Sequence, residues 1–285
     1  MDALIQTARY KYHERLLEEG ILTVDSSGIP SNADRDSKLS IAVAKGIADS
    51  LQAKVGLKAE GQTSGAKFET VNMQFIEETF LKLSHLRPGK WHVAKLGNRN
   101  SIKTSSFSQY EHLDYLSSLT KSDPRLAASL GNDYMVAPDV VVYRDPEEDE
   151  VINSGLQVVE DIFATRTDIR KRFNPLPILH ASISAKWTIR SDRAQNSRTE
   201  ALGLIRNRKG HLPHIMVVTA EPLPSRIASL AMGTGDIDCV YHFALNELIE
   251  TIEEIGAEDA QEMIKILVEG KRLKDISDLP LDLTV

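Results

Sequence analysis

Residues 178–189 read Ile-Leu-His-Ala-Ser-Ile-Ser-Ala-Lys-Trp-Thr-Ile, and this apolar run predicts a buried β-strand. Side chains alternate along a strand with period two, so Ser184 and Lys186 point to one side while Ile183 and Ala185 point to the other. A lysine on an apolar strand predicts a partner for its charge, because an ammonium group is rarely buried alone. The strand therefore indicates both a β-sheet and a polar site on it.

Other segments of the chain continue this pattern outward. Short β-like runs predict further strands at residues 91–96, 139–143, 215–219 and 239–243. Apolar residues at helical spacing predict helices at 2–19, 37–55, 68–83, 109–119, 158–172, 193–205 and 226–232, and two more within 245–273. The polar stretch 60–65 predicts a loop. Helices on both sides of a short central sheet define an α/β fold, and since no Pro- or Gly-rich linker interrupts residues 1–285, a single domain is expected.

The composition limits the class of protein. The chain has 285 residues, 41% apolar and 26% charged, which is ordinary for a globular protein. Cys239 is the single cysteine, so no intrachain disulfide can form, and a cytoplasmic location is expected. No apolar run approaches the ~18 residues of a membrane span, so no membrane partner is expected. The net charge of −7 disfavours bulk coating of nucleic acid but permits a DNA enzyme with a local basic cleft.

Acidic side chains accompany Lys186 in the predicted fold. Asp139 begins an apolar strand, and Glu200 lies on the helix that follows the lysine strand and could return over the sheet toward it. Glu69 is expected at the N-terminal end of helix 68–83. Converging carboxylates can hold Mg²⁺, which polarises a phosphoryl oxygen and lowers the pKa of a bound water. Because a lysine beside the ion can orient that water, these residues predict phosphodiester hydrolysis.

Three features together resemble the PD-(D/E)XK nucleases: Pro138-Asp139, the later Ser184-Ala185-Lys186, and Glu200. They are similar to the type II restriction endonuclease variant in which serine replaces the usual acid before the lysine and a helix-borne glutamate substitutes. With the run 190–193, Arg-Ser-Asp-Arg, the chain closely resembles the tetrameric NgoMIV-type enzymes. The resemblance implies a restriction-endonuclease-like mixed central sheet flanked by helices. It also implies Mg²⁺-dependent cleavage of double-stranded DNA at a palindromic CCGG-containing site, GCCGGC, after the first G, leaving 5′ overhangs and 5′-phosphates.

The same resemblance assigns roles to the residues of the site. Asp139 and Glu200 would be metal ligands, and the backbone carbonyl of Ala185 would be a third ligand. Lys186 would orient or activate the attacking water, and Ser184 would support the site.

The same resemblance implies that Glu69 is an accessory acid near these residues.

Each feature also has an ordinary structural explanation. Glu69 could only favour a helix N-terminus through the helix dipole. Glu200 could be a solvated residue on an amphipathic helix, and Pro138-Asp139 could be a turn or cap. The nuclease interpretation depends on their joint order and spacing.

The charged residues directly after strand 178–189 suit base recognition. Arginine can donate two hydrogen bonds to guanine O6 and N7, and aspartate can accept one from cytosine N4. Arg190, Asp192 and Arg193 therefore suit consecutive G and C pairs, and their position would couple recognition to the geometry at Lys186. The same residues could instead form a salt-bridge cluster at a helix start, which contributes little at a surface.

Further recognition residues and partners rest mainly on the resemblance. Arg226 and Asp34 are expected to read the outer base pair, and Gln62 is expected to reach the minor groove from its loop. The resemblance also implies a homotetramer that engages two DNA duplexes. A cognate DNA methyltransferase is the expected biological companion, because an unprotected host genome would be cut.

Two competing functions remain compatible with the residues alone. One is a structure- or damage-directed nuclease of DNA repair with the same fold, which would smear or nick a plasmid rather than cut it into discrete fragments. The other is a DNA-binding protein without catalytic activity, which would leave the plasmid intact when Mg²⁺ is added.

Overall fold

A six-stranded mixed sheet forms the centre of the computed structural model. The structure describes residues 3–56, 61–96, 102–123, 125, 128, 137–189, 191–233 and 235–285, and for 61–63 and 191–194 only the backbone. The strands lie side by side in chain order: β1 (Trp91–Lys95), β2 (Val140–Arg144), β3 (Ile178–Lys186), β4 (His214–Thr219), β5 (Cys239–His242) and β6 (Leu273–Asp275). β1, β2 and β3 pair antiparallel, whereas β3 to β6 run parallel.

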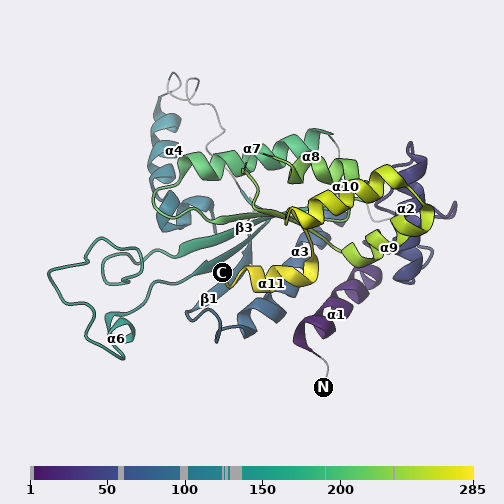
Figure 1. Cartoon of the computed structure of the whole chain (residues 1–285). Coiled ribbons are helices and arrows are strands. Elements are labelled where there is room, and N and C mark those ends of the chain that lie inside the picture. Colours follow the sequence, from purple (N-terminus) through teal and green to yellow (C-terminus); the bar gives the residue numbers. More distant parts are fainter. Residues whose placement is uncertain are drawn as a thin grey trace.

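Helices cover both faces of this sheet, which gives the expected layered α/β arrangement. Figure 1 shows α7, α8 and α10 above the strands, with α3 and α11 below them and α1 at the lower right. The described helices are α1 (Leu4–Glu18), α2 (Lys38–Ser50), α3 (Gly61–Thr79), α4 (His112–Ser122), α6 (Asp149–Ile152), α7 (Ser191–Asn207), α8 (Pro224–Ala231), α9 (Leu245–Ile255), α10 (Glu258–Glu269) and α11 (Leu279–Asp282). Short 3-10 turns are η1 (Phe80–Lys82), η2 (Thr104–Ser106), η3 (Ser108–Tyr110) and η4 (Ile276–Asp278).

Helix α3 packs against the antiparallel half of the sheet because it carries an apolar stripe at helical spacing. Phe68, Val71 and Phe75 on this stripe are fully buried, as are Val140 and Val142 on β2. α3 contacts β1, β2 and β3, and α1 packs against α3. These buried side chains belong to one apolar core cluster, which includes residues from Ala8 to Leu283.

The strand register determines where the polar side chains meet. Val140 at the start of β2 lies opposite Ile183 near the end of β3, so Asp139, directly before β2, lies beside Ser184. β4 is parallel to β3, with Thr219 beside Lys186. The start of β2 and the ends of β3 and β4 therefore share one end of the sheet.

Most of the predicted elements are confirmed, with bounds that shift by a few residues. The predicted strand 178–189 ends earlier, at Lys186, and the predicted helix 37–55 ends at Ser50. β6 was not predicted, because it is three residues long and its middle residue is a lysine. The loop predicted at 60–65 is wrong for residues 61–65, since α3 begins at Gly61. The polar composition disfavours a helix there, but propensity is a weak term that tertiary packing overrides.

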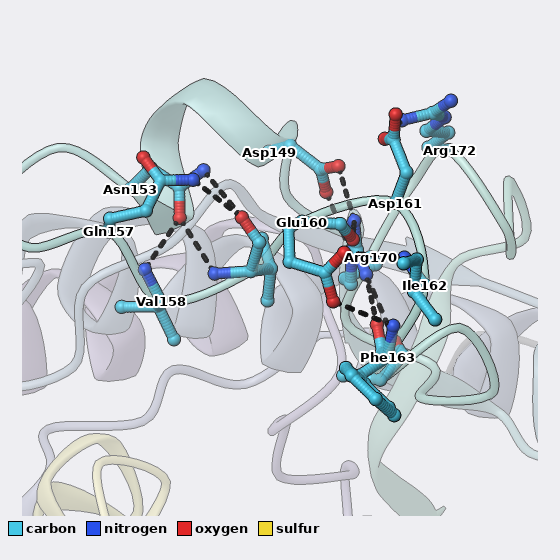
Figure 2. A network of polar contacts seen from close by, with 12 residues as sticks. Asp149, Asn153, Gln157, Val158, Glu160, Asp161, Ile162, Phe163, Arg170 and Arg172 are labelled. Carbon is cyan, nitrogen blue, oxygen red and sulfur yellow. Dashed lines mark hydrogen bonds and ion pairs between the residues drawn. The ribbon is translucent and has the colours of Figure 1, made fainter.

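The helix predicted at residues 158–172 is also wrong. Side-chain oxygens in and before this segment accept from several of its backbone N–H groups, as Figure 2 shows. Those of Ile162 and Phe163 are N–H groups that a helix over 158–172 would bond internally. Asn153 Oδ1 accepts from the backbone N–H groups of Val158 and Val159 (2.9 Å each). The Glu160 carboxylate accepts from those of Ile162 (2.7 Å) and Phe163 (2.8 Å). The apolar residues of this segment therefore recur at helical spacing although the segment does not form a helix.

This segment is part of an arm, residues 145–177, that joins β2 to β3 and projects away from the sheet in Figure 1. Arg170 lies at its centre with a fully buried side chain (0% exposed). Its guanidinium forms two hydrogen bonds to Asp149 (2.8 and 2.5 Å) and donates to the carbonyls of Glu160 (3.0 Å) and Phe163 (2.9 Å). The arm is thus organised around the buried guanidinium of Arg170.

Candidate active site and DNA-binding residues

The Asp139 carboxylate accepts hydrogen bonds from the end of β3. Its Oδ2 atom accepts from the Lys186 ammonium (2.9 Å) and from the backbone N–H of Ala185 (2.8 Å), and the Ser184 hydroxyl lies 3.5 Å away. The side chains of Lys186 and Asp139 are 18% and 20% exposed, so the ion pair is partly shielded but open to solvent. Lys186 therefore has the charge partner that its apolar strand predicted.

Glu200 reaches the same place from α7. The Ser184 hydroxyl hydrogen-bonds to it, and the charges of Lys186 and Asp139 both act on it. Burial is the main cause of a raised Glu200 pKa, and the negative charge of Asp139 raises it further. The structure thus brings Asp139, Glu200, Lys186 and Ser184 together from two strands and a helix.

This arrangement fits a hard divalent cation. Two neighbouring carboxylates are stabilised by a cation between them, and Mg²⁺ favours carboxylate oxygens while keeping several waters. Within the described ranges, no group of three or more His, Cys, Asp or Glu side chains could hold a metal. The remaining ligands at this site would therefore be backbone, water or phosphate oxygens.

Glu69 lies in the middle of α3, not at its N-terminal end as predicted, because the helix begins at Gly61. Its carboxylate forms an ion pair with Lys95 on β1 (2.9 Å). Lys95 is paired with Val140 in the sheet, so Glu69 is one strand away from Asp139. The ion pair thus holds the Glu69 carboxylate at β1, the strand next to β2.

The residues predicted to read the inner base pairs are only partly described. Arg190 lies outside the described residues. Asp192 and Arg193 belong to the first turn of α7, which begins directly beyond β3, and their side chains are not described. Gln62 lies in the first turn of α3, contrary to the loop predicted for it, and its side chain is likewise not described.

Asp34 and Arg226, which are 192 residues apart in sequence, form an ion pair. Asp34 precedes α2, and Arg226 lies in α8. Both side chains line an open cleft of about 940 Å³, together with Ile189 and Arg198. The pair predicted for one base pair is therefore close in space, on the side of α7 that faces α8.

Glu221 is a buried acid that the sequence analysis missed. It follows β4 and is 1% exposed, and its carboxylate accepts from the N–H groups of Ile189 (2.8 Å) and Leu223 (3.2 Å). Arg226 lies 3.8 Å from it. Burial raises the pKa of Glu221 to about 7. An acid directly after an apolar strand, at the sheet end that also carries Lys186, was the signal that could have indicated it.

Comparison with known proteins assigns the chain to a family. A family model described as NgoMIV restriction enzyme matches residues 12–285. The chain is 50% identical over 286 aligned residues, covering 100% of both chains, to the type II restriction enzyme NgoMIV of Neisseria gonorrhoeae. More distant solved structures are Bse634I with cognate DNA (14% identity, 86% of this chain and 91% of that one, TM-score 0.41) and a PspGI–substrate DNA complex (15%, 98% and 90%, TM-score 0.26).

The class of protein follows from these matches. The chain is a type II restriction endonuclease, a site-specific deoxyribonuclease with the restriction-endonuclease-like fold. Within that class it belongs to the NgoMIV restriction enzyme family. The predicted fold class and the predicted enzyme class are confirmed. No helix in the described ranges is long and apolar enough to cross a bilayer.

Proposed function

We propose that this enzyme hydrolyses double-stranded DNA at the palindrome GCCGGC, after the first G, leaving 5′ overhangs and 5′-phosphates, and that it requires Mg²⁺. The observation that carries the chemistry is the meeting of Asp139, Glu200 and Lys186 at one end of the sheet. The relative's name supports site-specific cleavage of DNA, and the CCGG-containing site rests on the motif resemblance.

Asp139, Glu200 and the backbone carbonyl of Ala185 would hold the metal. In an extended strand, the N–H and C=O groups of one residue face the same neighbouring strand. The N–H of Ala185 donates to Asp139, so its carbonyl faces the same side. A bound Mg²⁺ would polarise the scissile phosphate and lower the pKa of a water.

The remaining side chains of the site position the reacting groups. The Lys186 ammonium is held at Asp139 and would orient the attacking water or balance charge on the phosphate in the transition state. The Ser184 hydroxyl, which contacts both acids, would hold Glu200 in place. Glu69, neutralised by Lys95, would act only as an accessory acid beside the phosphate path.

Base recognition would come from the elements around the cleft. Arg190, Asp192 and Arg193, between β3 and the body of α7, would read the inner G and C pairs in the major groove. Arg226 and Asp34 would read the outer pair, because an arginine and an aspartate side by side match the acceptors of guanine and the donor of cytosine. Gln62 would reach the minor groove.

A homotetramer that binds two duplexes is also proposed. The arm supports it with apolar side chains in solvent: Ile162 and Phe163 are each 74% exposed, yet the backbone around them is fixed by Glu160 and Arg170. Ordered, exposed apolar groups on a projecting element indicate a protein contact. A cytoplasmic location and a protecting DNA methyltransferase follow from an enzyme that would otherwise cut its host's DNA.

A plasmid digest tests the proposal against its competitors. An unmethylated plasmid with known GCCGGC sites is incubated with the protein, with and without Mg²⁺, and the fragment ends are sequenced. Discrete fragments whose 5′ ends begin at the first C of the site are expected, with Mg²⁺ only. Smearing or nicking would favour a repair nuclease, an intact plasmid a non-catalytic DNA-binding protein, and ends at another sequence would refute the site.

A further inference from the structure

Glu221 connects elements that the proposed function assigns to separate tasks. One carboxylate oxygen accepts from the N–H of Ile189, the residue directly before Arg190. The other accepts from the N–H of Leu223 at the start of α8 and lies 3.8 Å from Arg226. One buried side chain therefore contacts the backbone leading to the inner readers and the side chain of the outer reader.

The backbone around Glu221 reaches the catalytic strand as well. The N–H of Glu221 donates to the Thr219 hydroxyl (3.1 Å), which in turn donates to the carbonyl of Lys186 (2.8 Å). The carbonyl of Ala220, directly before Glu221, accepts a hydrogen bond from the side-chain amide of Asn32 (2.8 Å). Asn32 is two residues before Asp34 in the sequence. The segment 219–223 thus holds the ends of β3, α8 and the loop before α2 in one frame.

A carboxylic acid is unfavourable at such a buried position. Desolvation of a carboxylate can exceed the stabilisation that its partners give, and an apolar residue of similar size often gives equal stability. Here each carboxylate oxygen accepts from a backbone N–H group, and the guanidinium of Arg226 lies 3.8 Å away. The arrangement suits a residue that sets positions rather than one that fills space.

We infer that Glu221 is a positioning residue for sequence discrimination: it fixes Arg226 and the backbone before Arg190 relative to Lys186, so that reading the correct base pairs and aligning the scissile phosphate occur in one rigid frame. The inference rests on the proposed function of Arg226 as a base reader. A purely structural Glu221 would instead support the N-terminus of α8 and affect stability alone.

The test measures discrimination rather than activity alone. Sequencing of the ends left by the wild-type enzyme first establishes its own site, so that a wrong GCCGGC assignment is detected separately and the comparison proceeds at the site found. Single-turnover cleavage rates are then measured on that site and on palindromes altered at the outer pair or at the next pair (for GCCGGC, ACCGGT and GTCGAC). The variants are Glu221→Gln and, as matched control, Glu247→Gln, whose carboxylate pairs with Arg9 elsewhere.

The expected result is a fall of about tenfold in the preference for the correct outer pair in Glu221→Gln, since a displaced arginine loses much of its bidentate contact. The loss should come from slower cleavage of the correct site. Glu247→Gln should keep the wild-type preference even where loss of its ion pair with Arg9 lowers the melting temperature. In an Arg226→Ala background the outer-pair effect of Glu221→Gln should disappear, as coupled residues are not additive.

An unchanged preference in folded Glu221→Gln, or an effect on the outer pair that persists in full without Arg226, would overturn the inference. If Glu221→Gln does not fold, Glu221→Asp, which keeps the charge and shortens its reach, is measured in the same way. Equal rate losses on all three duplexes would assign Glu221 to stability alone.

Discussion

The ammonium of Lys186 lies 2.9 Å from a carboxylate oxygen of Asp139, 47 residues away in sequence. The antiparallel register of β2 and β3 produces this contact, because it places the beginning of one strand beside the end of the other. Glu200 reaches the same point from α7. The functional predictions begin from this meeting of one cation with two acids.

Replacing Lys186 with alanine should reduce cleavage of a GCCGGC duplex by about 10²–10⁴-fold, the range expected when a positioned group that serves the attacking water is lost. Sequence-specific binding should survive, because the proposed base readers are elsewhere. Single-turnover cleavage and gel-shift titration measure the two effects. Lys90→Ala, which removes a surface partner of Asp145, is the control and should cleave normally. Cleavage by Lys186→Ala at the wild-type rate would remove the lysine from the mechanism.

Replacing Glu200 with glutamine should separate metal binding from folding. The raised pKa of Glu200 reflects burial and the nearby charge of Asp139, so a neutral amide should raise the melting temperature of the metal-free protein at pH 8. Mg²⁺ should stabilise the wild type, as any ligand of the native state does, but not the variant. Thermal melts across a Mg²⁺ series test this, with Glu78→Gln at a surface pair as control. Equal Mg²⁺ stabilisation of both proteins would place the ion elsewhere.

The stability of the enzyme should depend on pH through Glu221. Its pKa is raised by burial from 4.5 to about 7, so the unfolded chain ionises before the folded one as pH increases. The free energy of unfolding should therefore fall between about pH 4.5 and 7, by at most about 1.4 kcal/mol per pH unit from this group. The contribution is fully present below pH 4.5 and lost above 7.

Urea unfolding of the wild type and of Glu221→Gln at several pH values isolates this contribution. Charged or titratable neighbours of Glu221 are Arg226, Asp34 and His242. They are present in both proteins, so their own ionisation largely cancels in the difference. Burial lowers the pKa of His242 to about 4, so it stays neutral across most of this window. A difference that does not change with pH would show that Glu221 ionises normally.

The arm should contribute to assembly. Phe163→Ser should shift the enzyme toward smaller species in sedimentation velocity while leaving its melting temperature nearly unchanged, since the phenyl ring is exposed in the monomer. Tyr115→Ser, an exposed aromatic on α4, is the control and should leave the assembly as it is. A tetramer that persists in Phe163→Ser at low protein concentration would exclude this residue from the contact.

Five of the six strands could be predicted, because each lies in a short β-like run of the sequence, whereas β6 is only three residues long. The alternation in residues 178–189 also predicted that Ser184 and Lys186 share a side. The arm could not be predicted, because its apolar residues follow a helical spacing while Asn153 and Glu160 take up the backbone donors. That competition depends on side-chain geometry that a hydrophobic pattern does not contain.

Part of the candidate site could likewise be predicted from the sequence, and part could not. Asp139, Lys186 and Glu200 were proposed together from their order and from a family resemblance, and the fold brings them together. Glu221 was not, because its partners Ile189 and Arg226 come from a different loop and a different helix. Contacts of that kind follow from how crossover connections pack, which no local pattern reveals.

The most direct test of the central claim is a crystal structure of the enzyme bound to a GCCGGC duplex with Mn²⁺ as an anomalous scatterer. The account predicts an ion bound by carboxylate oxygens of Asp139 and Glu200 and by the carbonyl of Ala185, at about 2.0–2.3 Å, with the Lys186 ammonium beside the scissile phosphate. An ion held by Glu69, or a scissile phosphate that does not approach Lys186, would contradict it.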